Sequence, residues 1–180
     1  GVSNHKEFQM KYSDRCRDVF YDQCDEGTAW YGLPYWDSDV GHEGCGLVAL
    51  ATCVELLSAQ QMNPYDAYRL RRAAGLDQLH MSSATGAGVC GGDVTLRLNQ
   101  VNEALFGIKS IALARTVDAF REALSRDSVI WASSRNCFFL DNMGEKRFLD
   151  DGHVLCFWTY EDGVFYAKDC HFTAERGNNA

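Results

Sequence analysis

The sequence predicts an α+β fold in which an N-terminal helical half packs on a C-terminal antiparallel β-sheet. Helical periodicity dominates residues 47–124, whereas strand-like alternation dominates residues 128–168. Helices and strands that are segregated along the chain in this way are typical of α+β domains. With 180 residues, 46% hydrophobic content and only two prolines, the chain is long enough to bury a full core in one domain.

The domain is expected over residues 20–170. Residues 1–19 are polar and charged, which predicts an N-terminal arm, and residues 171–180 predict a frayed C-terminal tail. The chain begins at Gly1 without a signal-like segment, which is typical of a trimmed or matured product. The net charge is −8 and no basic block occurs, so a nucleic acid or an anionic membrane is not an expected partner. No apolar run approaches the ~18 residues of a membrane-spanning helix.

An aromatic cluster follows the arm. Trp30, Tyr31, Tyr35 and Trp36 lie within seven positions of one another. Such residues usually pack under a loop, and the functional alternative is the wall of a cleft that holds an extended substrate. In that alternative Trp30, Tyr31 and Trp36 contact the substrate. Gly44, which has no side chain, lets the substrate approach the protein backbone closely.

The stretch Gly44-Cys45-Gly46 and the apolar run after it organise the rest of the prediction. Apolar residues recur between positions 47 and 57 at spacings of three and four, which predicts a helix with one buried face. The glycine-rich segment in front places Cys45 at or just before the N-terminus of that helix. Unpaired N–H groups and the helix dipole favour a thiolate there, and the thiolate is the nucleophilic form of cysteine. Cys45 is therefore the candidate nucleophile, with a small core cysteine as the alternative.

Two further helices have clear boundaries. Pro64 in a first turn and Gly75 as a C-terminal stop predict a helix between them. Thr116 is a predicted N-cap for a helix over residues 117–124.

The sequence between these helices is less regular. The glycine-rich residues 76–92 predict a long loop that could serve as a lid. Asp93 is the expected cap of another helix, which reaches Phe106, and residues 108–113 alternate like a short strand.

The strands are expected at residues 128–132, 137–140 and 146–149, followed by a hairpin. His153–Tyr160 and Val164–Lys168 form the two arms of this hairpin, joined by a turn at residues 161–163. Counting across the turn places His153 opposite Asp169 or its neighbour.

A histidine beside a carboxylate suggests a catalytic role for the hairpin. The carboxylate of Asp169 can orient the imidazole of His153, which leaves the other ring nitrogen to take a proton from a thiol. An exposed histidine with a chance acidic neighbour is the alternative. The side-chain amide of Gln23 is the candidate second donor, beside the Cys45 N–H, for the oxyanion of an acyl-transfer intermediate.

The remaining cysteines predict no zinc site, because none forms a C-x-x-C pair. Cys53 and Cys156 fall in apolar segments and are expected to be buried thiols. The better disulfide candidates lie in polar sequence: Cys16, Cys24, Cys90, Cys137 and Cys170. This number of cysteines favours an exported protein, secreted or on the cell surface, over a cytoplasmic one.

The ordered set of these residues resembles the C39-like branch of the papain-like cysteine peptidases. The matching segments are Tyr21–Asp25 with Trp30–Gly32, Gly44–Ala51, Asn63–Asp66 with Gly75, and Gly152–Leu155 with Asp169. The resemblance implies a papain-like fold over residues 20–170, with Cys45 as nucleophile, His153 as general base and acid, Asp169 as orienting group and Gln23 in the oxyanion hole. The chain departs from the family at residues 47–49, where Pro-Thr-Ser is common, and at Cys170, where a proline is common.

The expected activity is hydrolysis of an amide bond in a peptide or protein, through an acyl-enzyme on Cys45. We expect a monomer that needs no metal or cofactor. Two alternatives stay open: a transglutaminase-type transfer of the acyl group to an amine, and a non-catalytic module that binds peptides in the aromatic cleft.

Overall fold

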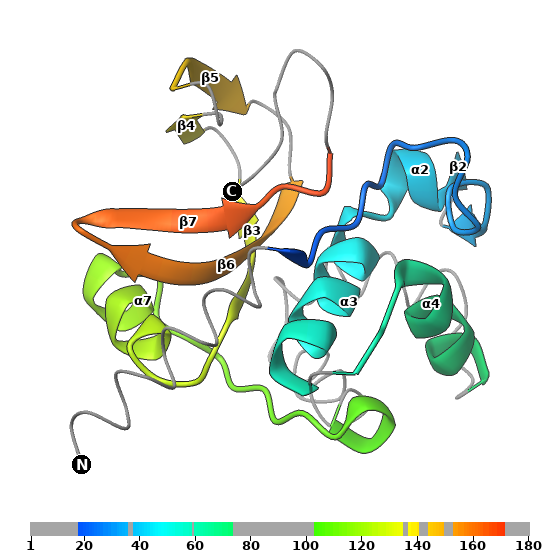
Figure 1. Cartoon of the computed structure of the whole chain (residues 1–180), viewed down its shortest axis with the longest axis horizontal. Coiled ribbons are helices and arrows are strands. Elements are labelled where there is room, and N and C mark those ends of the chain that lie inside the picture. The colour runs from blue at the N-terminus through cyan, green and yellow to red at the C-terminus, as the bar shows by residue number, and fades with distance from the viewer. Residues whose placement is uncertain are drawn as a thin grey trace.

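The computed structural model describes residues 18–35, 38–58, 60–73, 103–134, 137–140, 144–149 and 153–171. Within these residues the fold is mixed α+β, with helices first and most strands after them, as the sequence predicts (Figure 1). Most of the predicted arm and tail, the loop 76–92, the helix cap at Asp93 and the side chain of Trp36 lie outside the described residues. No helix in the described ranges is long and apolar enough to cross a membrane.

The strands within the described ranges form three small antiparallel sheets, β1–β2, β3–β6–β7 and β4–β5. The elements in chain order are β1 (Pro34–Tyr35), β2 (Ser38–Asp39), α2 (Val40–Glu43), α3 (Cys45–Ser58), α4 (Pro64–Ala73), α7 (Val117–Leu124), β3 (Ile130–Ser134), β4 (Cys137–Leu140), β5 (Lys146–Leu149), β6 (His153–Glu161) and β7 (Val164–Lys168).

The helix α3 lies between α4 on one side and the β3–β6–β7 sheet on the other (Figure 1). It begins at Cys45, as predicted, but it is buried almost all round, with ten buried residues between Gly46 and Leu56. The prediction of one buried face was therefore wrong. Apolar surface on α3 is removed from water on two sides, because the first half of the chain covers one side and β6 covers the other.

The predicted starts of two helices are confirmed. At α4 the Asn63 Oδ1 atom accepts a hydrogen bond from the Asp66 N–H at 2.8 Å, and Asp66 Oδ2 accepts from the Asn63 N–H at 3.3 Å. At α7 the Thr116 hydroxyl accepts from the Ala119 N–H at 3.1 Å. Local polar side chains thus define where both helices begin.

The predicted strand at residues 108–113 is wrong, because that segment is irregular. Gly107 has a φ of 68°, a left-handed conformation that ends the preceding helical turn, and Ile111 is 72% exposed. Alternation alone does not make a strand, and none of the strands among the described residues pairs with this segment. The strand β3 also begins at Ile130, two residues later than expected.

The β6–β7 hairpin forms as predicted, with a tight turn at Asp162 and Gly163. Both turn residues have positive φ values, 51° and 82°, which is the requirement of a type I′ turn. One face of the hairpin packs against α3 through Cys156 and Trp158. On the other face, the rings of Phe157 and Phe165 pack against Phe120 of α7. The sheet therefore holds the start of β6 beside α3.

Candidate active site

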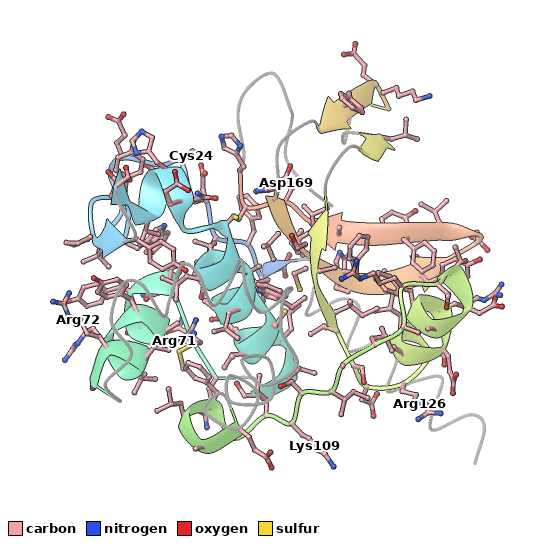
Figure 2. The ribbon with its side chains drawn as sticks, turned by 180° about the vertical axis from the view of Figure 1, so that it is seen from behind. Cys24, Arg71, Arg72, Lys109, Arg126 and Asp169 are labelled. Carbon is pink, nitrogen blue, oxygen red and sulfur yellow. The ribbon has the colours of Figure 1, made fainter. Side chains whose placement is uncertain are left out.

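Three chain segments meet where the sheet reaches the N-terminal end of α3. Cys45 is the first residue of α3, His153 is the first residue of β6, and Asp169 directly follows β7. Figure 2 shows Asp169 at the end of the sheet, next to the end of α3 that follows α2. The structure thus brings Cys45 together with two residues that lie more than a hundred positions further along the chain.

His153 and Asp169 form a buried pair. The His153 Nε2 atom lies 2.5 Å from Asp169 Oδ1, and the two side chains are only 7% and 9% exposed. The same carboxylate oxygen accepts the backbone N–H of His171 at 3.0 Å, which fixes the carboxylate. The predicted contact is therefore confirmed, and the observed register places Asp169 two residues from the position opposite His153. The β6–β7 pairing ends at Cys156 opposite Lys168, so Asp169 reaches His153 from the chain just after β7.

Cys45 is the second hydrogen-bond partner of the imidazole. Its side chain is hydrogen-bonded to His153, and since Nε2 faces Asp169, the remaining nitrogen for the thiol is Nδ1. Burial lowers the pKa of His153, but the hydrogen bonds to Asp169 and Cys45, and their charges, overcome burial and raise this pKa from 6.5 to about 9. The imidazolium form is consequently favoured at neutral pH, which suits a thiolate–imidazolium pair.

This raised pKa predicts a pH-dependent stability. A group whose pKa is higher in the folded chain stabilises the fold fully below its unfolded value, here 6.5, and loses that stabilisation as the pH rises through about 9. We expect the free energy of unfolding to fall by roughly 3 kcal/mol across this window because of His153. Chemical denaturation at pH 6 and pH 9.5 measures the change, and in a His153→Gln variant most of it should disappear. Equal pH dependence in both proteins would contradict the assignment.

Gln23 is buried close to the candidate nucleophile. Its backbone N–H donates to the Cys170 carbonyl at 2.8 Å, and its side-chain amide donates to the carbonyls of Val40 and Gly41 at 3.1 and 3.2 Å. The side chain thus lies beside α2, the helix that leads into Cys45. Its two N–H groups, however, are directed at carbonyls of α2.

Cys170 connects Gln23 to the nucleophile. Its thiol lies 3.4 Å from Gln23 Oε1 and 3.8 Å from the backbone oxygen of Cys45. Burial, followed by the nearby Cys45 and Asp169, raises the pKa of the Cys170 thiol well above its ordinary value. Cys170 was expected among the disulfide candidates, and this was wrong: it is a buried thiol within the site.

The turn before Cys45 is tightly packed. The Gly44 N–H donates to the Val40 carbonyl at 2.8 Å, and a Cβ atom on Gly44 would lie 2.6 Å from both the Val40 carbonyl oxygen and its Cγ1 atom. Glycine is therefore required at this position to bring α2 against the start of α3. Asp39 caps α2 by accepting the His42 N–H, which leads the chain into this turn.

A Gly44→Ala variant should consequently be destabilised by about 2 kcal/mol, because the added methyl group forces α2 away from α3. Urea denaturation measures the loss. The matched control is Gly32→Ala, where an added Cβ meets nothing within 4 Å and stability should be retained. Equal stability of the two variants would show that the close contact at Gly44 does not constrain the turn.

Some residues of the aromatic cluster pack inside the protein, and Tyr31 is partly exposed. Tyr35 is fully buried in the core, and Trp30 donates its indole N–H to the Asp22 carbonyl at 2.9 Å while packing edge-on against Tyr21. Tyr31 is half-buried and lies against the ring of His42, three residues before Cys45. Of the described candidates for substrate contact, Tyr31 is therefore the aromatic residue placed beside α2.

The sequence did not predict the role of one residue that supports the site. The indole N–H of Trp131, on β3, donates to the Gly46 carbonyl at 2.9 Å and so ties the sheet to the first turn of α3. Its sequence position in a strand predicts only core packing. Nothing in the local sequence could have indicated that a residue 85 positions downstream of Gly46 binds there.

No group of three or more metal-binding side chains occurs within the described part of the chain. Comparisons of the chain with family models, curated proteins and solved structures found no match. The geometry of Cys45, His153 and Asp169 is therefore the feature that points to a function.

Proposed function

We propose that this protein is a cysteine-dependent hydrolase, a peptidase or amidase of papain-like fold, that cleaves an amide bond through an acyl-enzyme on Cys45. The observation that carries this proposal is the buried hydrogen bond between His153 and Asp169, with Cys45 hydrogen-bonded to the same imidazole. A thiol at a helix N-terminus, a buried histidine that contacts it and a fixed carboxylate beside the histidine match the nucleophile, the base and the orienting group of a catalytic triad.

The reaction begins when the Cys45 thiolate, formed by proton transfer to His153, attacks the carbonyl carbon of the substrate. The electron pair of the C=O bond moves to oxygen, and its return expels the amine, which takes its proton from the His153 imidazolium. Water then loses a proton to His153 and attacks the thioester. This second step releases the carboxylic acid and returns the thiol.

Backbone and side-chain donors would stabilise the oxyanion in both steps. The Cys45 N–H is the first donor, since a helix N-terminus leaves its early N–H groups without partners in the helix. The Gln23 amide is the second, and in this proposal it exchanges one of its two contacts with α2 carbonyls for the substrate oxygen. The substrate itself would be a peptide or a protein segment that reaches Cys45 beside Tyr31.

An activated ester tests this proposal without knowledge of the natural substrate. A p-nitrophenyl ester of an N-acyl amino acid should give a burst of nitrophenol, one equivalent per active site, followed by slower turnover. Digestion during the burst should find the acyl group on Cys45. An added amine that accepts the acyl group in place of water would favour transfer over hydrolysis, and the absence of both burst and acylation would refute the proposal.

A further inference from the structure

A second pair of sulfur atoms lies between the same two elements that carry Cys45 and His153. Cys53 follows Cys45 by about two turns of α3, and Cys156 is the third residue after His153 on β6. Their Sγ atoms are 3.3 Å apart, and the two residues are 4% and 0% exposed. Leu56 and Trp158 pack around them, so the pair is enclosed by apolar side chains.

We propose that Cys53 and Cys156 form a redox-controlled disulfide that ties α3 to β6 behind the candidate active site. A disulfide places its sulfur atoms about 2.05 Å apart, so the two thiols need to approach by only ~1.3 Å, within reach of small side-chain rotations. The inference concerns these two cysteines alone, and it does not depend on whether Cys45 is a nucleophile.

The oxidant that the step requires is a low-molecular-weight disulfide such as oxidised glutathione. One cysteine, as its thiolate, attacks a sulfur of the small disulfide and displaces one small thiol, which leaves a mixed disulfide. The second cysteine then attacks the protein sulfur of that mixed disulfide and displaces the other small thiol. Two protein thiols are oxidised to one disulfide, and one small disulfide is reduced to two thiols.

The position of the pair determines when this exchange occurs. The hydrogen bond between the two thiols, followed by burial, raises the pKa of the Cys156 thiol well above its ordinary value, so Cys156 holds almost no thiolate in the folded protein. Exchange is therefore slow in the native state and fast while the chain folds or when α3 separates from the sheet. After closure, the same burial protects the disulfide from reductants.

Closure should stabilise the fold, because the two cysteines are 103 positions apart in the chain. A covalent link across a loop of that length restricts the unfolded chain strongly and should raise the melting temperature by about 10 °C. The link also joins the helix of the candidate nucleophile to the strand of its base. The spacing between Cys45 and His153 should consequently survive to higher temperature in the oxidised protein.

The experiment refolds the full chain from denaturant in a buffer of reduced and oxidised glutathione. Remaining thiols are alkylated under denaturing conditions, and peptides are identified by mass spectrometry. Trypsin cannot separate Cys45 from Cys53, since no lysine or arginine lies between residues 18 and 68. Chymotrypsin is used instead, because it cleaves after Leu47 and Leu50, between the two cysteines.

We expect a linked Cys53–Cys156 peptide and a melting temperature about 10 °C above that of the chain refolded in a thiol reductant without oxidised glutathione. A Cys53→Ala variant should lose both the link and the shift, whereas a Cys24→Ser variant should keep both. If Cys53 and Cys156 remain alkylatable after refolding, or if either pairs with another cysteine, the proposal is wrong. That result leaves alkylation of Cys45 in the native protein unaffected, so it is distinguishable from a failure of the proposed function.

Discussion

Replacement of Cys45 by alanine is expected to abolish ester and amide turnover completely. The acyl-enzyme forms on this sulfur, which is hydrogen-bonded to the His153 imidazole. Turnover of the activated ester, with the burst amplitude as a count of active sites, measures the loss. Native-state alkylation at residue 45 disappears in the same variant.

A cysteine on the same helix provides the matched control for this variant. Cys53→Ala also replaces a thiol of α3 by a methyl group, but its sulfur lies against Cys156 and away from the site. It should therefore keep the burst. Turnover that persists undiminished in Cys45→Ala would show that the nucleophile has been wrongly assigned.

The second large effect is expected for His153→Gln. Glutamine fills a similar volume but cannot transfer protons, so both the attack of the thiol and the departure of the amine lose their catalyst. Loss of a general acid and base typically costs 10²–10⁴ in rate, and we expect a fall of about 10³-fold in turnover per acylated site. Steady-state kinetics on the activated ester and on an amide measure it, with the larger fall expected for the amide because its leaving group needs the proton.

His42 provides the matched control for this experiment. It also has a carboxylate partner, with 2.7 Å between its Nδ1 atom and Asp39 Oδ1, and it lies three residues before Cys45, but its side chain is 61% exposed. A His42→Gln variant should retain nearly all the activity. If the two variants exchanged their effects, the base would be His42 and the buried pair would be structural.

Local signals explain why part of the fold was predictable from the sequence. Thr116 and Asn63 satisfy helix N–H groups from within the same turn, and the Asp162-Gly163 turn selects the hairpin geometry. These choices involve residues a few positions apart. The predictions that failed concern segments whose structure depends on distant partners. Residues 108–113 have no described strand beside them. The helix α3 is buried on both sides only because β6 packs on it.

The candidate site was predictable to a similar extent. The contact between His153 and Asp169 followed from one hairpin, so an offset of two residues from exact opposition still brought the pair together. The contacts of the Gln23 amide and the Trp131 indole, and the approach of Cys53 to Cys156, depend on how helix and sheet pack. Side-chain periodicity carries no information about which residue meets which across such an interface.

The rate at which iodoacetamide alkylates Cys45, followed from pH 5 to pH 10, tests the central claim most directly. An ordinary thiol is only about 0.3% ionised at pH 6 and reacts slowly, whereas a thiolate paired with the His153 imidazolium reacts at that pH. The proposed pair predicts that wild-type protein reacts at pH 6 more than about tenfold faster than His153→Gln, with the two rates converging above pH 9. Superimposable profiles that both rise as for an ordinary thiol would contradict the pairing of Cys45 with His153, and with it the proposed function.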